Sequence, residues 1–254
     1  MEKKRTIIML IVIVIVLSCL HMVKRYDFYF NIGNEMTLVN KYEVNAGEVN
    51  QISLNLYSTD IIIKKSNNEK ILVEYYSNQD KNAVIEYENE TIMVDETEYN
   101  EVCVGICNIE RKLILYIPSS FDGMYDFVTT SGDTKSEIVF LNNDTNIMTT
   151  SGDIALDVVN DVNITTVSGD VHISGVTNAL DVTTTSGDVY IGVLDNKEYS
   201  NIATTSGDVK IDTNKSDCYI QVETTSGDRR INKSNRKSDI VLNIKTTSGD
   251  VKVN

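Results

Sequence analysis

The chain has 254 residues, contains one proline and no tryptophan, and carries a formal net charge of -14 at pH 7. This length allows one large domain or two modest ones, and the composition excludes collagen-like and proline-rich classes. The negative charge argues against nucleic acid as a partner, because an acidic surface repels the phosphate backbone.

Residues 1–25 are predicted to be a membrane anchor. An uncharged run of 18 residues, Thr6 to Val23, lies between basic residues at 3–5 and a basic pair at 24–25. The run is just long enough to span a bilayer, and no A-x-A cleavage pattern follows it. The basic residues before it favour a cytoplasmic N-terminus. The chain is therefore predicted to cross the bacterial cell membrane once through residues 6–23, with its C-terminal domain extracellular.

A second interpretation of this segment concerns Cys19. The letters VLSC at 16–19 fit the loose lipoprotein pattern of apolar and small residues before a cysteine, which would make Cys19 the acylated first residue of a lipoprotein. A small residue inside a membrane helix is the preferred interpretation, because the bulky Leu20 and the basic pair 24–25 follow closely. Both interpretations end in membrane attachment, and residues 26–39 are then a juxtamembrane linker.

Residues 40–127 are predicted to be rich in strands but irregular, and to cap one end of the repeats that follow. The letters LYSTDIIIK at 56–64 resemble a degenerate repeat, with Ile61 and Ile63 on one face. The segments 82–96 and 111–120 are further predicted strands. Their carboxylates at Glu86, Glu88 and Glu90 are interpreted as a solvated strand face.

Residues 128–254 contain a repeated motif. Ser-Gly-Asp occurs seven times, with successive spacings of 20, 17, 18, 20, 20 and 22 residues. Repetition at a nearly fixed period indicates a stacked architecture, whereas a catalytic centre needs one asymmetric cluster of unlike groups. The serines of the seven motifs are Ser131, Ser151, Ser168, Ser186, Ser206, Ser226 and Ser248.

Side-chain alternation predicts what each repeat forms. Apolar residues alternate with polar ones after each Asp, as at Val209 and Ile211, and this is the period of a β-strand. The same count places the first Thr of each motif inward and the second outward, with a more variable turn between successive motifs. The predicted fold class is all-β, a parallel β-solenoid (β-helix) of two-strand coils of about 20 residues, preceded by one N-terminal transmembrane helix. The inward row is Thr129, Thr149, Thr166, Thr184, Thr204, Thr224 and Thr246.

Glycine and aspartate are assigned conformational roles at each corner. Gly207 and its equivalents are expected to have a positive φ, and each Asp is expected to accept hydrogen bonds from its own turn. The alternative for the Asp row is bridging by divalent cations. It is not favoured, because a cation site needs several oxygens that converge on one point. The row is Asp133, Asp153, Asp170, Asp188, Asp208, Asp228 and Asp250.

No catalytic, cofactor-binding or metal-binding residue is predicted, and the chain is predicted not to be an enzyme. Cys103 and Cys107 pair only if residues 104–106 make a tight turn, and no further Cys or His completes a zinc site. Cys218 is expected to be a small buried residue. Of the two histidines, His21 lies in the anchor and His172 is expected on the surface.

The segment STDIIIK, the strand that ends at Pro118 and the train of TTSGD repeats resemble the bacterial putative-adhesin family of unknown function, over about residues 45–254. The resemblance implies a membrane segment followed by an outward β-solenoid, and a place in the cell envelope, in some members with links to envelope-stress responses. It carries over no catalytic residue, because the family has no established one.

The sequence leaves three hypotheses for function. The preferred one is a non-enzymatic, membrane-anchored surface module that binds a cell-wall polymer or an envelope protein. The second is a self-assembling structural solenoid of bactofilin type, whose C-terminal edge is open because the chain stops at Asn254, four residues after the last Asp. The third is a polysaccharide-active β-helix enzyme, which needs an asymmetric cleft.

Overall fold

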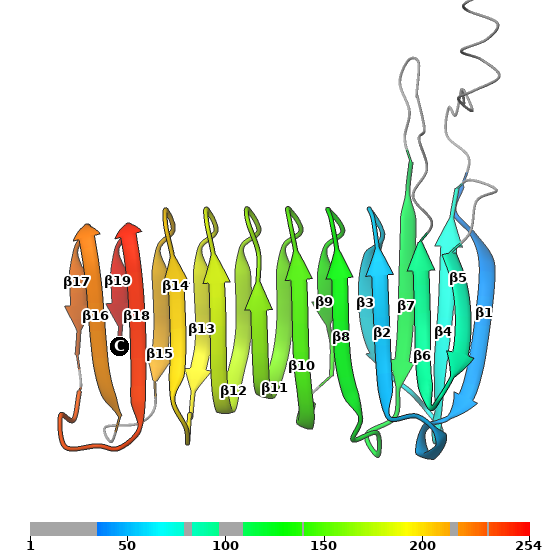
Figure 1. Cartoon of the computed structure of the whole chain (residues 1–254), viewed down its shortest axis with the longest axis horizontal. Coiled ribbons are helices and arrows are strands. Elements are labelled where there is room, and N and C mark those ends of the chain that lie inside the picture. Colours follow the sequence, from blue (N-terminus) through cyan, green and yellow to red (C-terminus); the bar gives the residue numbers. More distant parts are fainter. Residues whose placement is uncertain (1–34, 79–82, 97–108, 139, 214–217, 233) are drawn as a thin grey trace, which may run out of the picture.

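A computed structural model describes residues 35–254 except 79–82, 97–108, 139, 214–217 and 233. This part of the chain contains 19 strands and one short 3-10 helix, which confirms the predicted all-β class. The strands stand side by side along the long axis of the molecule (Figure 1).

The elements follow one another closely along the chain. The first part forms β1 (Thr37–Asn45), η1 (Ala46–Glu48), β2 (Gln51–Leu56), β3 (Asp60–Lys65), β4 (Lys70–Ser77), β5 (Ala83–Glu88), β6 (Thr91–Glu96) and β7 (Arg111–Ile117). The repeats begin with β8 (Met124–Thr129), β9 (Thr134–Ser136), β10 (Phe140–Thr149), β11 (Ile154–Thr165), β12 (Val171–Thr184) and β13 (Val189–Leu194). They end with β14 (Ser200–Thr204), β15 (Val209–Thr213), β16 (Tyr219–Ser226), β17 (Arg229–Ile231), β18 (Val241–Ser248) and β19 (Val251–Val253).

The strands form two layers that face each other. The β2 layer runs β5, β6, β2, β8, β10, the later parts of β11 and β12, then β14, β18 and β16. The β3 layer runs β1, β4, β7, β3, β9, the first parts of β11 and β12, then β13, β15, β19 and β17. These pairings are parallel except β1–β4, β4–β7 and β5–β6, which are antiparallel. A coil of the repeat region therefore gives one strand to each layer.

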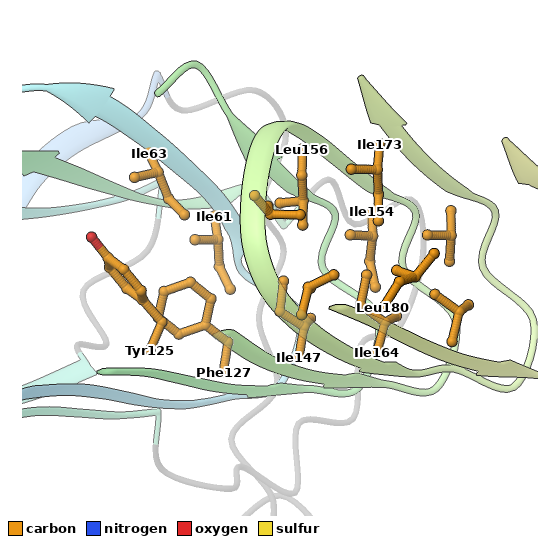
Figure 2. Packing of buried hydrophobic residues seen from close by; sticks show 14 of the residues in the cluster. Ile61, Ile63, Tyr125, Phe127, Ile147, Ile154, Leu156, Ile164, Ile173 and Leu180 are labelled. Atoms are coloured by element: carbon orange, nitrogen blue, oxygen red, sulfur yellow. The ribbon is translucent and has the colours of Figure 1, made fainter. Parts of the chain in front are cut away.

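The core is a thin sheet of side chains between the layers. Figure 2 shows Tyr125, Phe127 and Ile147 of the β2 layer facing Ile61 and Leu156 of the β3 layer. Burial of such side chains stabilises the fold by roughly 1.5 to 3 kcal/mol each. The predicted parity is confirmed, because the inward threonines are buried at 129, 149, 166, 184, 204 and 246. Ile61 and Ile63 are also fully buried, as expected for a degenerate repeat.

The corner glycines are required by close stacking, and the expected positive φ is wrong. No glycine in the described ranges has a φ in the left-handed region. A Cβ on Gly207 would lie 2.0 Å from the carbonyl oxygen of Gly187, and a Cβ on Gly187 would lie 2.0 Å from that of Gly169. The corners of neighbouring coils thus touch through their backbones, and any side chain would collide with the next coil.

The Asp row is bonded between coils and not, as expected, within each turn. The backbone N–H of Asp208 donates to Asp188 Oδ1 at 2.8 Å, and that of Asp188 donates to Asp170 Oδ1 at 2.9 Å. The same bond joins every neighbouring pair from Asp60 to Asp228. An N–H bond to a carboxylate is strong, so the ladder offsets the repulsion between neighbouring charges.

The coils do not stack in chain order at the C-terminal end. Strand β18 pairs with β14 on one side and β16 on the other, and β19 lies in the same way between β15 and β17. The coil of residues 241–253 is therefore inside the stack, and the coil of residues 219–231 is the last one (Figure 1). The expectation that the final repeat forms the open edge is wrong.

A buried ion pair lies beside the corner between β2 and β3, which is the last described corner at the other end of the stack. Glu96 and Arg111 lie 2.9 Å apart, with side chains 2% and 9% exposed. Glu96 Oε2 accepts the backbone N–H groups of Tyr57 at 2.7 Å and Ser58 at 3.3 Å. In the repeats the equivalent serine donates to a carbonyl of the preceding coil, as Ser206 does to Thr185 at 2.9 Å. Glu96 Oε2 thus takes the acceptor role that a backbone carbonyl has in the repeats.

Candidate ligand groove

One outward row of the β2 layer consists of aspartate and asparagine. Its members lie three positions before each inward threonine, and strand pairing makes them neighbours in successive coils. Adjacent strands are about 4.8 Å apart, so the row presents a carboxylate or an amide at that interval. We call it the Asx row: Asp126, Asn146, Asn163, Asp181, Asn201 and Asn243.

Hydrogen bonds orient most of the Asx row. Asn146 Nδ2 donates to Asp126 Oδ1 at 2.8 Å, and Asn201 Nδ2 donates to Asp181 Oδ1 at 3.2 Å. Asn243 Nδ2 continues the chain to Asn201 Oδ1 at 3.0 Å. These bonds fix the planes of the amide and carboxylate groups, and each oxygen keeps capacity for a further donor. The row is therefore a prepared set of hydrogen-bonding groups.

A groove of about 440 Å³ lies along this row at the start of the strands. Two exposed apolar side chains, Met124 and Tyr199, line it and are 49% and 60% exposed. Inward residues such as Tyr125 and Leu180 contribute to its lining. Burial raises the pKa of Tyr125, so its phenol is neutral. An aromatic ring beside oriented polar groups is the usual composition of a binding site.

The groove is acidic. Asp126, Asp144, Asp161 and Asp181 line it, and none of its lining residues is Lys or Arg. Asp161 accepts from Asn178 at 2.7 Å and from Asn160 at 2.8 Å, so its carboxylate is held in place. Such a field repels anionic polymers and attracts amines. The groove therefore suits a ligand with hydroxyl, amide or amine groups.

The outward face of the β3 layer is less suited to a ligand. His172 stacks on Tyr190 with ring centroids 4.6 Å apart, and Lys210 Nζ lies 4.9 Å from the Tyr190 centroid. The tyrosine ring is thus already engaged by its neighbours. The cations of this face also stand beside the Asp row, which lines the same hollow. His172 is exposed, and the prediction of a surface residue is confirmed.

The other residues singled out in the sequence lie away from the groove. Cys218 is buried, as predicted, and its thiol donates to the Tyr219 carbonyl at 3.8 Å. The carboxylates of the β5–β6 hairpin, Glu86, Glu88 and Glu90, are exposed. Cys19, His21, Cys103, Cys107 and the run 6–23 lie outside the described residues. Among the residues that are described, no helix has the length and apolar character needed to cross a bilayer.

Sequence reasoning missed the Asx row, although its signal is present. The third residue before the inward threonine is Asp or Asn in six of the seven repeats and Gln221 in the other. That regularity was hidden by the stronger Ser-Gly-Asp signal. The contribution of Tyr199 had no comparable signal, because it depends on which turn residues reach the groove.

Several solved structures are similar to the chain. A putative cell adhesion protein from Clostridium sporogenes is 12% identical, with a TM-score of 0.38, over 86% of this chain and 97% of that one. A putative adhesin and a putative lipid binding protein, both from Parabacteroides distasonis, are each 12% identical, with TM-scores of 0.47, over 90% of this chain and 100% of theirs.

None of the curated proteins compared with the chain matches it. The sequence model of one protein family, Toastrack DUF4097, matches residues 49–254, which include every coil of the stack. The chain therefore belongs to the Toastrack DUF4097 family.

Proposed function

We propose that the protein is a non-enzymatic module of the bacterial cell envelope, anchored in the membrane by residues 6–23, that binds an extended glycan along the Asx row. The carrying observation is the groove itself, in which oriented Asp and Asn side chains repeat from coil to coil beside the exposed Tyr199. A polymer that lies along the stack meets an equivalent group about every 4.8 Å.

The charge of the groove narrows the class of glycan. Four carboxylates and no basic side chain line it, so a sugar with amine or amide substituents is favoured over a uronate or a phosphate polymer. Hydroxyl and amide groups of such a sugar can donate to the carboxylates and accept from the asparagine Nδ2 groups.

Co-sedimentation of the full chain in detergent with defined polymers tests this proposal. The probes are chitosan oligosaccharides, which carry amines, chitin oligosaccharides, which are neutral, and polygalacturonate, which is anionic. We expect binding to decrease in that order. Stronger binding to polygalacturonate than to either amino-sugar probe would contradict the proposal.

The same samples separate binding from catalysis. A polysaccharide-active enzyme would release shorter or unsaturated products, whereas a binding module leaves the oligosaccharides intact.

Location is tested separately: protease added to wall-less cells should degrade the part after residue 25 and leave the first residues protected. Labelling with a palmitate analogue that is lost in Cys19→Ser would show that the anchor is a lipid on Cys19 and not a membrane helix.

A further inference from the structure

The last coil of the stack, residues 219–231, carries an arginine at a core position. Strand pairing places Arg229 in register with Val251, which is itself in register with Val209. Both valines are 1% exposed, whereas Arg229 is exposed. The other coils have Ile, Val or Thr at this position, all of them buried: Ile61, Thr134, Ile154, Val171 and Val189.

The corners do not decide which coil comes last. The coils of 219–231 and 241–253 both contain Thr-Thr-Ser-Gly-Asp at the corner. Their glycines stack with the same close contact: a Cβ would lie 2.1 Å from the next carbonyl at Gly227 and 2.0 Å at Gly249. Either coil would therefore fit beside the coil of 200–213. The difference lies in the interior, where chain-order stacking would bury Arg229 between Val209 and Val251.

A buried guanidinium without a counter-charge is strongly unfavourable. In the observed order the side chain instead reaches across the end of the stack, and Arg229 Nη1 donates to the Val222 carbonyl at 3.2 Å. The N–H of Tyr219 donates to the carbonyl of Ile240, the residue just before β18, at 2.9 Å. Peptide groups alternate in direction along a strand. Those of residues 220 and 222 therefore point away from β18, toward the free edge of the sheet.

A second contact covers the same edge. The outward N–H of Ile220 donates to Ser234 Oγ at 3.0 Å, and Ser234 belongs to the segment 232–240 between β17 and β18. A free strand edge is a template for pairing with another chain, and charged residues at the edge are a common protection. Arg229 and Ser234 thus occupy two backbone groups that a further strand would need.

We propose that Arg229 keeps the coil of 219–231 at the end of the stack and closes that end to a second copy of the chain. Arg229 thus blocks end-to-end assembly at the end surface of the stack, where a second solenoid would otherwise pair. The inference is independent of the proposed ligand.

Engineered disulfides report the coil order. Ala203 and Lys245 are register partners, so their α-carbons are about 4.8 Å apart, within disulfide range. Ala203 and Glu223 are two coils apart, about 9.6 Å, which is too far. In the full chain we expect oxidation to link Ala203→Cys with Lys245→Cys and not with Glu223→Cys, with peptide mapping to exclude the native cysteines.

Adding Arg229→Val to the variant with Ala203→Cys and Glu223→Cys should produce the 203–223 link, a molecular mass that rises with protein concentration in sedimentation, or both. Arg230→Val is the matched control, since it removes the same charge from the neighbouring outward position. If Arg229→Val does not fold, Arg229→Val combined with Val251→Arg should fold in chain order and form the 203–223 link. The proposal is overturned if these variants keep only the 203–245 link and the monomer mass, or if Arg230→Val behaves in the same way as Arg229→Val.

Discussion

Gly207 lies against the backbone of Gly187, and a Cβ on it would meet the Gly187 carbonyl at 2.0 Å. Backbone on both sides cannot move aside, so Gly207→Ala should destabilise the protein by about 1 to 3 kcal/mol through overpacking. Gly47→Ala is the control, because nothing lies within 4 Å of its added Cβ. Equal shifts of the two melting temperatures would contradict the close-stacking explanation.

Tyr75 gives the fold a dependence on alkaline pH. Burial, followed by the nearby Glu96 charge, raises the pKa of Tyr75 to about 12 from its usual 10.0. The folded state therefore holds the phenol proton more tightly than the unfolded state. The associated stability is complete below about pH 10 and is lost as pH rises through about 12.

Thermal melts of the wild type and Tyr75→Phe at about pH 9 and about pH 11.5 test this linkage. We expect the melting temperature to fall less with pH in Tyr75→Phe, because Phe cannot ionise. An equal fall in both proteins would show that Tyr75 does not titrate differently on folding.

At the scale of elements, the buried Glu96–Arg111 pair supports the corner between β2 and β3. Glu96→Gln removes the carboxylate that lies 2.9 Å from the Arg111 guanidinium, in a site where the Arg111 and Glu96 side chains are 9% and 2% exposed. Removing one partner of a buried pair costs about 3 to 5 kcal/mol. Glu43→Gln is the control: Glu43 and Lys70 lie 3.3 Å apart but are 41% and 47% exposed. Its effect should stay below about 1 kcal/mol, and a comparable loss in both variants would remove the special role of Glu96.

The Asp row should not need a cation. Each described carboxylate from Asp60 to Asp250 accepts the N–H of the next Asp through Oδ1, whereas calcium prefers six to eight converging oxygens. We expect the same melting temperature in chelator and in about 1 mM calcium. A calcium-dependent rise that disappears in Asp188→Asn with Asp208→Asn would contradict this.

For the molecule as a whole, the repeat pattern predicts the local structure well. Parity fixes that Ile61 and Thr204 point inward, because a one-residue slip would expose every core side chain. The order of the coils is not predictable from the repeats, since each corner fits beside every other. Arg229, a charged residue at a position that is apolar or Thr in the other described coils, is the signal for the exchange of the last two coils.

The groove is partly predictable for a related reason. The Asx row follows the repeat period and is visible at Asn146 or Asn163 once the inward threonines are known. Tyr199 reaches the groove from a variable turn, where the spacing of residues does not predict which side chain will face the groove. The corner hydrogen bonds were assigned to the wrong partner because a local turn and a stacked coil offer donors to the same carboxylate.

The affinity of groove variants for chitosan oligosaccharides tests the central claim most directly. Titration of the full chain in detergent should give an affinity that falls roughly five- to tenfold in Tyr199→Ala, with a further loss when Asn163→Ala is added. His172→Ala, which removes an exposed aromatic residue from the opposite face, should leave the affinity unchanged. Equal affinities in all of these proteins, or an equal loss in His172→Ala, would show that the Asx row is not the binding site.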